Sequence, residues 1–252
     1  MTLDPPPPCP VCGGATALHD VVDFNRTCEE LKGQFLPRAG VGVYYALCQG
    51  CGFCFAPELY SWSLQDFATH IYNDDYVQAD PDYAQARPTG NAGMVVAGFG
   101  DFAGEIRHLD YGGGAGLLSK LMGEKGFDST SYDPFVNTDT DPATLGTFDL
   151  ITAFEVFEHV PDVNALMTAL SALRKPNGVI LFSTMASDGQ IAPNTRLTWW
   201  YAAPRNGHIS LFTKASLAHL AGRYGFNFGS FNDNLHIMWT QAPPFAARML
   251  PK

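Results

Sequence analysis

The sequence predicts an α/β protein with a doubly wound, mostly parallel sheet, preceded by a small cysteine-rich module. Two observations predict the sheet. From Glu105 onward short apolar runs alternate with helix-like runs, and a glycine-rich turn joins the first of these runs to the first helix. The module is predicted by the cysteines, because all six lie in the first 60 residues. We therefore expect three parts, namely a metal-binding module over 1–60, connector or lid helices over 61–104 and the main domain over 105–252.

Composition excludes several classes of partner. The chain has 252 residues, of which 46% are apolar, and this is enough for a substantial core. No run of about 18 apolar residues is present, and the proline-rich start does not resemble a signal peptide, so we expect a cytoplasmic protein without a membrane partner. The net charge of −10, without a stripe of lysine and arginine, opposes nucleic-acid binding. We expect a small-molecule partner, and the oligomeric state stays open.

Two C-x-x-C turns define the N-terminal module. Cys9 and Cys12 form the first turn, and Cys48 and Cys51 form the second, each followed by glycine. Each turn directs two thiolates to one point, so the four sulfurs suit a tetrahedral, structural Zn²⁺ site. Disulfides are disfavoured in a cytoplasmic chain, and the duplication disfavours a redox pair.

The remaining parts of the first hundred residues carry weaker signals. We expect Cys28 and Cys54 to be buried thiols, although Cys54 is close enough in sequence to replace a zinc ligand. A strand is expected over 41–47. Apolar residues at helical spacing predict a helix over 66–76, and a second helix is expected after Pro81.

The glycine-rich turn from Asp110 to Gly116 predicts a small-molecule site. Glycines at alternate positions allow a sharp turn and a close approach to a ligand, and the N–H groups at the start of the next helix face that ligand. The spacing differs from the dinucleotide pattern G-x-G-x-x-G, because Leu117 or Ser119 stands where the last glycine is required. A nicotinamide oxidoreductase is therefore a less favoured interpretation.

The glycine-rich turn is the first of three sequence landmarks, and two more follow it along the chain. The segment 130–133 reads as a strand that ends in Asp133, whose carboxylate can accept both hydroxyls of a ribose. The segment 148–160 begins as a buried strand and continues into an acidic and histidine-containing turn.

These three landmarks, taken in order, resemble the class I S-adenosylmethionine-dependent methyltransferases over about residues 83–241. The resemblance implies a Rossmann-like sheet with an antiparallel last strand, near 228–231 and 236–240, and a bound S-adenosylmethionine. The residues that it implies at the cofactor are Asp110, Gly112, Gly113, Gly114, Gly116, Asp133, Pro134, Phe135, Phe154, Glu155 and Val156. The N-terminal segment resembles the zinc-binding module that precedes sugar C-methyltransferases.

The residues that act on the methyl acceptor are expected near the end of the third landmark, the segment 148–160. Glu155, Glu158 and His159 share one face if the strand continues as a helical turn, and His208 follows the next strand at the same edge. The pattern resembles plant-type small-RNA 2′-O-methyltransferases and ubiquinone-pathway O-methyltransferases, which implies Mg²⁺ or Mn²⁺ on these four residues. A metal-free role, with His159, Glu158 and His208 as catalytic acid or base, and a purely structural role are the alternatives.

An aromatic segment lies ahead of His208. Trp199, Trp200, Tyr201 and Arg205 suit a planar or sugar-like acceptor, or the aromatics pack on the zinc module. We expect a methyltransferase that acts on a small-molecule acceptor at a hydroxyl oxygen. The alternative is a zinc-knuckle interaction protein whose nucleotide-binding domain is not catalytic.

Overall fold

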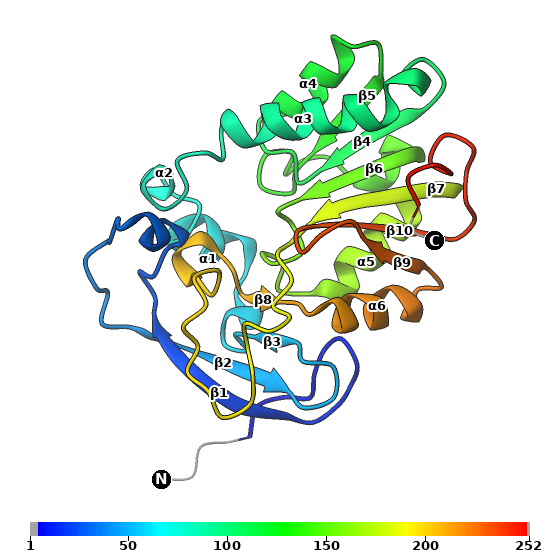
Figure 1. Cartoon of the computed structure of the whole chain (residues 1–252). Coiled ribbons are helices and arrows are strands. Elements are labelled where there is room, and N and C mark those ends of the chain that lie inside the picture. The colour runs from blue at the N-terminus through cyan, green and yellow to red at the C-terminus, as the bar shows by residue number, and fades with distance from the viewer. Residues whose placement is uncertain (1–4, 251–252) are drawn as a thin grey trace. The chain divides into compact units, whose positions relative to one another are not determined.

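The computed structural model describes residues 5–250 and divides into two compact units (Figure 1). The cysteine unit comprises Met1–Pro81, Glu158–Asn164 and Met185–Leu220. The sheet unit comprises Asp82–Phe157, Ala165–Thr184 and Ala221–Lys252. Among the described residues, no helix is long and apolar enough to cross a membrane.

The sheet unit is built on six strands. Their order is β5 (Asp128–Tyr132), β4 (Arg107–Tyr111), β6 (Phe148–Phe154), β7 (Arg174–Ser183), β10 (Leu235–Trp239) and β9 (Asn227–Ser230). The first four strands are parallel, whereas β10 pairs antiparallel with both β7 and β9. The predicted fold class, a mostly parallel sheet that ends in antiparallel strands, is confirmed.

Helices α3 (Ala86–Phe99) and α4 (Leu117–Gly123) cover one face of this sheet. Val95 and Phe99 of α3 are fully buried in the same cluster as Leu150 and Ile237 of the sheet. In helix α5 (Val163–Leu173) the larger apolar residues recur at helical spacing and are all buried. Those residues are Val163, Leu166, Met167, Leu170 and Leu173. The last helix is α6 (Lys214–Arg223).

The cysteine unit contains a four-stranded antiparallel sheet. Its order is β1 (Thr16–Asp23), β2 (Gly42–Cys48), β3 (Cys54–Phe55) and β8 (Ser210–Leu211). Leu211 of β8 pairs with Cys54 of β3, so a segment that follows β7 completes the sheet of the N-terminal module.

The helix predicted over 66–76 is shorter and interrupted in the structure. One helix was expected over 66–76, but the structure has α1 (Leu64–His70) and α2 (Tyr76–Ala79). The Asn73 side chain donates a hydrogen bond to the carbonyl of Thr69 at 3.0 Å, which satisfies an open carbonyl at the end of α1. Helix α1 therefore stops before the apolar pattern does.

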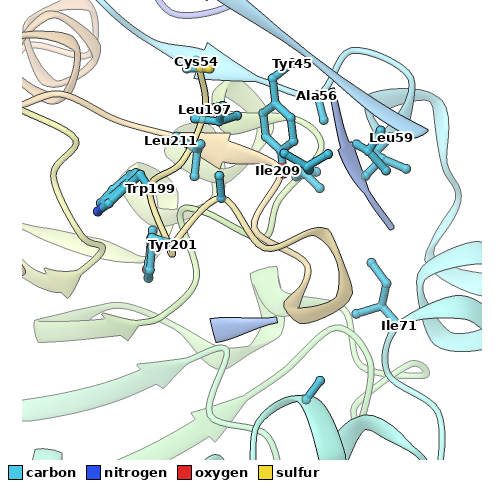
Figure 2. Packing of buried hydrophobic residues seen from close by; sticks show 14 of the residues in the cluster. Tyr45, Cys54, Ala56, Leu59, Ile71, Leu197, Trp199, Tyr201, Ile209 and Leu211 are labelled. Carbon is cyan, nitrogen blue, oxygen red and sulfur yellow. The ribbon is translucent and has the colours of Figure 1, made fainter. Parts of the chain in front are cut away.

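Aromatic and aliphatic side chains from distant segments fill the core of this unit (Figure 2). Tyr45 lies beside Ile209, and Trp199 and Tyr201 belong to the same buried cluster. The core position of Trp199 and Tyr201 matches the alternative in which the aromatics pack on the cysteine-rich module.

Candidate active site

The glycine turn has the backbone geometry that only glycine adopts easily. Gly112, Gly114 and Gly116 have φ values of +75°, +53° and +79°. The space at Gly112 also leaves no room for a larger side chain, because a Cβ there would lie 2.5 Å from Val156 Cγ2. A Cβ at Gly113 would lie 2.4 Å from an oxygen of Asp110. The loop thus combines left-handed turns with close packing on the side chains beneath it.

Asp133 is held at this loop by two backbone donors. Its Oδ2 accepts a hydrogen bond from Gly114 N at 2.9 Å, and its Oδ1 accepts one from Phe135 N at 2.8 Å. Each carboxylate oxygen has a second lone pair, so both can accept a further donor. A vicinal diol such as a ribose supplies two such donors.

Asp110, at the end of β4, has a different environment. Its side chain is buried, and Thr152 Oγ1 donates a hydrogen bond to its Oδ1 at 3.0 Å. Burial raises the pKa of Asp110 to about 7, and the nearby Asp133 charge acts in the same direction. Asp110 is thus a buried carboxyl packed against the loop at Gly113, whereas Asp133 is hydrogen-bonded to the loop at Gly114.

The other predicted cofactor residues follow two strands: Pro134 and Phe135 come after β5, and Phe154 to Val156 lie at and just after the end of β6. Phe154 and Val156 are nearly buried, whereas Phe135 beyond β5 is 37% exposed. Glu155 has a left-handed φ of +54°, and its N–H donates to Ser183 Oγ at 2.9 Å. The same hydroxyl donates to Glu155 Oε1 at 2.7 Å, so Ser183 fixes this unusual turn.

Three predicted reaction residues come together in the cysteine unit. Glu158 is fully buried, and the Tyr201 hydroxyl donates a hydrogen bond to its Oε1. His159 Nε2 lies 4.0 Å from the same oxygen. The rings of His159 and His208 have centroids 4.9 Å apart. Glu158, His159 and His208 thus form one cluster, which we call the histidine cluster.

The tautomer of His208 follows from its backbone contact. His208 Nδ1 lies 2.9 Å from the carbonyl oxygen of Tyr201, which can only accept, so Nδ1 carries the hydrogen in this contact. In the neutral ring Nε2 then carries the lone pair. This nitrogen can accept a proton or ligate a metal.

Two residues in contact with the histidine cluster have no predicted role there. The sequence predicts Tyr201 only as a wall for the acceptor or as part of the core, and its hydrogen bond to Glu158 joins positions that are 43 apart in sequence. Gly207 has a φ of +91°, and a Cβ there would lie 2.9 Å from His159 Nδ1. The Asn206-Gly207 pair ahead of His208 is a turn signal that could have indicated Gly207.

Arg205 binds polar groups of the segment that follows α1. Its guanidinium donates to the carbonyl of Ile71 at 2.7 Å and to Asn73 Oδ1 at 2.9 Å. Burial lowers the pKa of this side chain. Arg205 therefore ties the connector between α1 and α2 to the 3₁₀ helix Pro204–Asn206.

The four cysteines of the two turns converge. The Sγ atoms of Cys9 and Cys51 are 3.7 Å apart, and those of Cys12 and Cys48 are 3.4 Å apart. All four lie within 4.8 Å of one another. Zn–S bonds of about 2.3 Å in a tetrahedron place sulfurs about 3.8 Å apart, so this donor set fits zinc.

The other two cysteines lie elsewhere in this unit. Cys54 is buried in β3, and burial raises its pKa. Cys28 Sγ lies 3.6 Å from His208 Nδ1.

The ligand atoms of the histidine cluster also lie within 4.8 Å of one another. Glu155 belongs to the sheet unit, where its side chain accepts the hydrogen bond from Ser183. The predicted Mg²⁺ or Mn²⁺ ion on Glu155, Glu158, His159 and His208 stays a prediction.

Residues 82–228 match the profile of a family described as "Methyltransferase domain". This match covers more than half of the chain, and the protein therefore belongs to that family. The prediction of a methyltransferase is confirmed at the level of the family.

Curated relatives match over shorter segments. A ubiquinone biosynthesis O-methyltransferase of Bordetella avium is 34% identical over 104 residues, covering 31% of this chain and 42% of that protein. One from Idiomarina loihiensis is 31% identical over 138 residues, covering 42% of this chain and 54% of that protein. The chain thus spans about half the length of these relatives.

Solved structures resemble the chain at low identity. A 1,6-didemethyltoxoflavin-N1-methyltransferase of Burkholderia thailandensis has a TM-score of 0.49 and 18% identity, covering 77% of this chain and 93% of that one. The magnesium protoporphyrin IX methyltransferase of Synechocystis PCC 6803 has a TM-score of 0.42 and 18% identity, covering 72% and 95%.

Proposed function

We propose that the protein transfers a methyl group from S-adenosylmethionine to a hydroxyl oxygen of a small-molecule acceptor. The observation that carries this proposal is the glycine loop, whose Gly114 N–H holds Asp133 with spare lone pairs on both oxygens. Membership of the methyltransferase-domain family supports the reaction. The names of the two curated relatives, both O-methyltransferases, support oxygen as the acceptor atom.

The residues of the sheet unit fit S-adenosylmethionine. Asp133 would accept the two ribose hydroxyls, and the left-handed glycines let the backbone approach the cofactor closely. The end of β6, from Phe154 to Val156, would hold its methionine part. When bound, the cofactor supplies a methyl carbon on a positively charged sulfur, which an oxygen nucleophile attacks in line.

The histidine cluster would remove the proton of the acceptor hydroxyl. His208 presents a basic Nε2 because Nδ1 is engaged with the Tyr201 carbonyl. Glu158 is buried beside His159, and a buried carboxylate favours the protonated form of a neighbouring imidazole. We assign His159 and His208 the role of acid or base, with Glu158 supporting the charge.

The acid–base role is favoured over a magnesium ion by the donor chemistry of the described cluster. Magnesium prefers an octahedron of oxygen ligands, whereas this cluster offers two imidazoles and one carboxylate. Adding Mg²⁺ or Mn²⁺ to the methyl-transfer assay distinguishes the two roles.

We also propose that Cys9, Cys12, Cys48 and Cys51 hold a structural Zn²⁺. The convergence of four sulfurs at distances suited to one tetrahedral ion supports this assignment. All four ligands are protein thiolates, which is typical of a structural rather than a catalytic zinc.

Calorimetric titration of S-adenosylmethionine tests the proposed function. We expect binding to the wild-type protein, no competition by NADH, and affinity about 10 to 100-fold weaker in Asp133→Asn, because the amide loses charge-assisted hydrogen bonds to the ribose. The exposed Asp139→Asn is the matched control and should bind as the wild type does. Unchanged affinity in Asp133→Asn would refute the site.

The acceptor is tested separately by methyl transfer to catechol and vicinal-diol probes. Transfer that does not require added metal and is lost in His208→Asn supports the acid–base role. Transfer that requires Mg²⁺ or Mn²⁺ would instead assign the cluster to a metal.

A further inference from the structure

A continuous chain of hydrogen-bonded side chains runs through the sheet unit under the glycine loop. It begins at Ser119 on α4, crosses β5, β4 and β6, and returns to β4 at Asp110. The contacts in order are Ser119 Oγ to Ser129 Oγ at 2.8 Å, Ser129 Oγ to His108 Nδ1 at 2.7 Å, His108 Nε2 to Thr152 Oγ1 at 2.9 Å, and Thr152 Oγ1 to Asp110 Oδ1 at 3.0 Å. His108 and Thr152 are fully buried, so water does not interrupt the middle of the chain.

The direction of these bonds is determined when Asp110 is ionised. A carboxylate only accepts, so Thr152 must give it the single hydroxyl hydrogen. Thr152 then accepts from His108, which places the histidine hydrogen on Nε2. Nδ1 must consequently accept from Ser129. Burial lowers the pKa of His108 to about 3, so the ring is neutral at ordinary pH.

The opposite direction applies when Asp110 is protonated. The carboxyl hydrogen is then donated to Thr152, whose own hydrogen turns to His108 Nε2 at 2.9 Å rather than to the more distant carbonyl oxygen of Leu109 at 3.4 Å, and the histidine hydrogen resides on Nδ1. The two states interconvert if a proton enters at the Ser119 oxygen and each hydrogen moves one bond along the chain to Asp110. One proton is gained, each heavy atom stays in place, and the imidazole changes tautomer.

We propose that Asp110, Thr152 and His108 form a proton relay beneath the cofactor loop. In this relay the Nε2–H tautomer of His108 accompanies and stabilises the ionised form of Asp110, and the Nδ1–H tautomer accompanies the protonated form. His108 is thus a positioning residue that acts on the cofactor through Thr152 and Asp110. The link to the cofactor rests on the proposed function, whereas the relay itself does not.

The contact of Asp110 with the loop connects the relay to binding. Its Oδ2 and Ser131 Oγ would each lie 2.4 Å from a Cβ at Gly113, so both oxygens lie against the loop backbone. Besides His108, the titratable group that acts on Asp110 is Asp133, whose charge opposes its ionisation. S-adenosylmethionine carries a positive sulfonium, so it binds best to the ionised form and releases a proton from Asp110 near neutral pH.

Nuclear magnetic resonance of ¹⁵N-histidine protein tests the relay without cofactor. Between pH 9 and 5 we expect the His108 signals, assigned by their loss in His108→Gln, to change from the Nε2–H to the Nδ1–H tautomer without the ring becoming charged. Thr152→Val should abolish the change, and Thr152→Ser should retain it because the hydroxyl remains. A single tautomer across this range in the wild type would overturn the relay.

Calorimetry of S-adenosylmethionine in two buffers of different ionisation enthalpy tests the link to binding. We expect proton release near pH 7 in the wild type and in Thr152→Ser, and a several-fold loss of affinity at pH 7 but not at pH 9 in Thr152→Val. An equal loss at both pH values would show a merely structural role. Absence of binding by the wild type would refute the proposed function, while the tautomer measurement would still decide the relay.

Discussion

Two carboxylates at the glycine loop differ in burial and in hydrogen bonding, and these differences separate their roles. Asp133 accepts two backbone N–H bonds, which keep its carboxylate oriented for a ligand. Asp110 is only 3% exposed and has one neutral hydroxyl donor, so its ionised form is costly. The motif places both acids, but only the packing around each one distinguishes them.

The buried Asp110 predicts a pH-dependent stability of the protein without cofactor. Burial raises its pKa from 3.8 to about 7, so the folded protein binds this proton more tightly than the unfolded chain does. Stability contributed by this group is therefore present below about pH 4 and is lost as the pH rises to about 7, by up to about 4 kcal/mol. Chemical denaturation at pH 5 and pH 8 measures the free energy of unfolding at each pH. The difference between the two values should be smaller in Asp110→Asn than in the wild type.

Asp139→Asn, on the exposed surface of the same unit, is the control and should keep the wild-type pH dependence. If Asp110→Asn also kept it, the carboxyl would be ionised throughout this range, and the assigned environment would be wrong.

Tyr201 predicts an effect at the histidine cluster. Tyr201→Phe keeps the ring in the core but removes the hydroxyl that donates to the fully buried Glu158. We expect a loss of about 1–3 kcal/mol in the free energy of unfolding, measured by denaturant titration. Tyr44→Phe, at an exposed position of β2, should change this free energy little. A neutral Tyr201→Phe would mean that Glu158 does not depend on this donor.

At the scale of elements, the turn between β4 and α4 performs two tasks. It reverses the chain through left-handed glycines, and it packs its backbone on side chains from β4, β5 and the turn that follows β6. The left-handed positions favour glycine for backbone reasons, whereas Gly113 is required by space alone, because no positive φ is found there.

Gly113→Ala therefore tests the packing beneath the loop. The added methyl would lie 2.4 Å from Asp110 Oδ2 and Ser131 Oγ, so either the loop or these two side chains must shift. We expect affinity for S-adenosylmethionine to fall by at least about 10-fold in calorimetry, since a shift costing about 1.4 kcal/mol suffices. Gly123→Ala in α4, where a Cβ meets nothing within 4 Å, should bind normally. Wild-type affinity in Gly113→Ala would show that the loop yields without cost.

At the scale of the whole molecule, the chain enters each unit more than once. The cysteine unit takes residues from three separate parts of the sequence, and β8 joins a sheet otherwise made by the first 60 residues. The proposed zinc and the proposed cofactor belong to different units, because the four cysteines lie in one and the glycine loop in the other.

This separation predicts distinct responses in thermal unfolding. Cys48→Ser should lose zinc, measured by metal analysis, and should destabilise the cysteine unit, whereas Cys54→Ala should keep the metal. S-adenosylmethionine at 100 times its dissociation constant should stabilise the sheet unit by about 2.7 kcal/mol. Zinc retained at wild-type content in Cys48→Ser would contradict the four-cysteine site.

The sequence by itself determined the features that depend on neighbouring residues. Strand and helix periods, the glycine turn, the acid after β5 and the C-x-x-C spacing all act over a few positions, so the fold class and the methyltransferase family could be predicted. The helical spacing over 66–76 misled, because a single Asn73 side chain competes for a carbonyl of the helix.

Only the tertiary structure decided which distant residues meet. The partner of Glu158 is Tyr201, the partner of Cys54 is Leu211, and Arg205 lies against the end of α1. The chain from Ser119 to Asp110 likewise joins four segments, none of which carries a motif for it. Such contacts depend on how separate elements pack and on which buried polar atoms need a hydrogen-bond partner. Neither condition can be predicted from the spacing of residues along the chain.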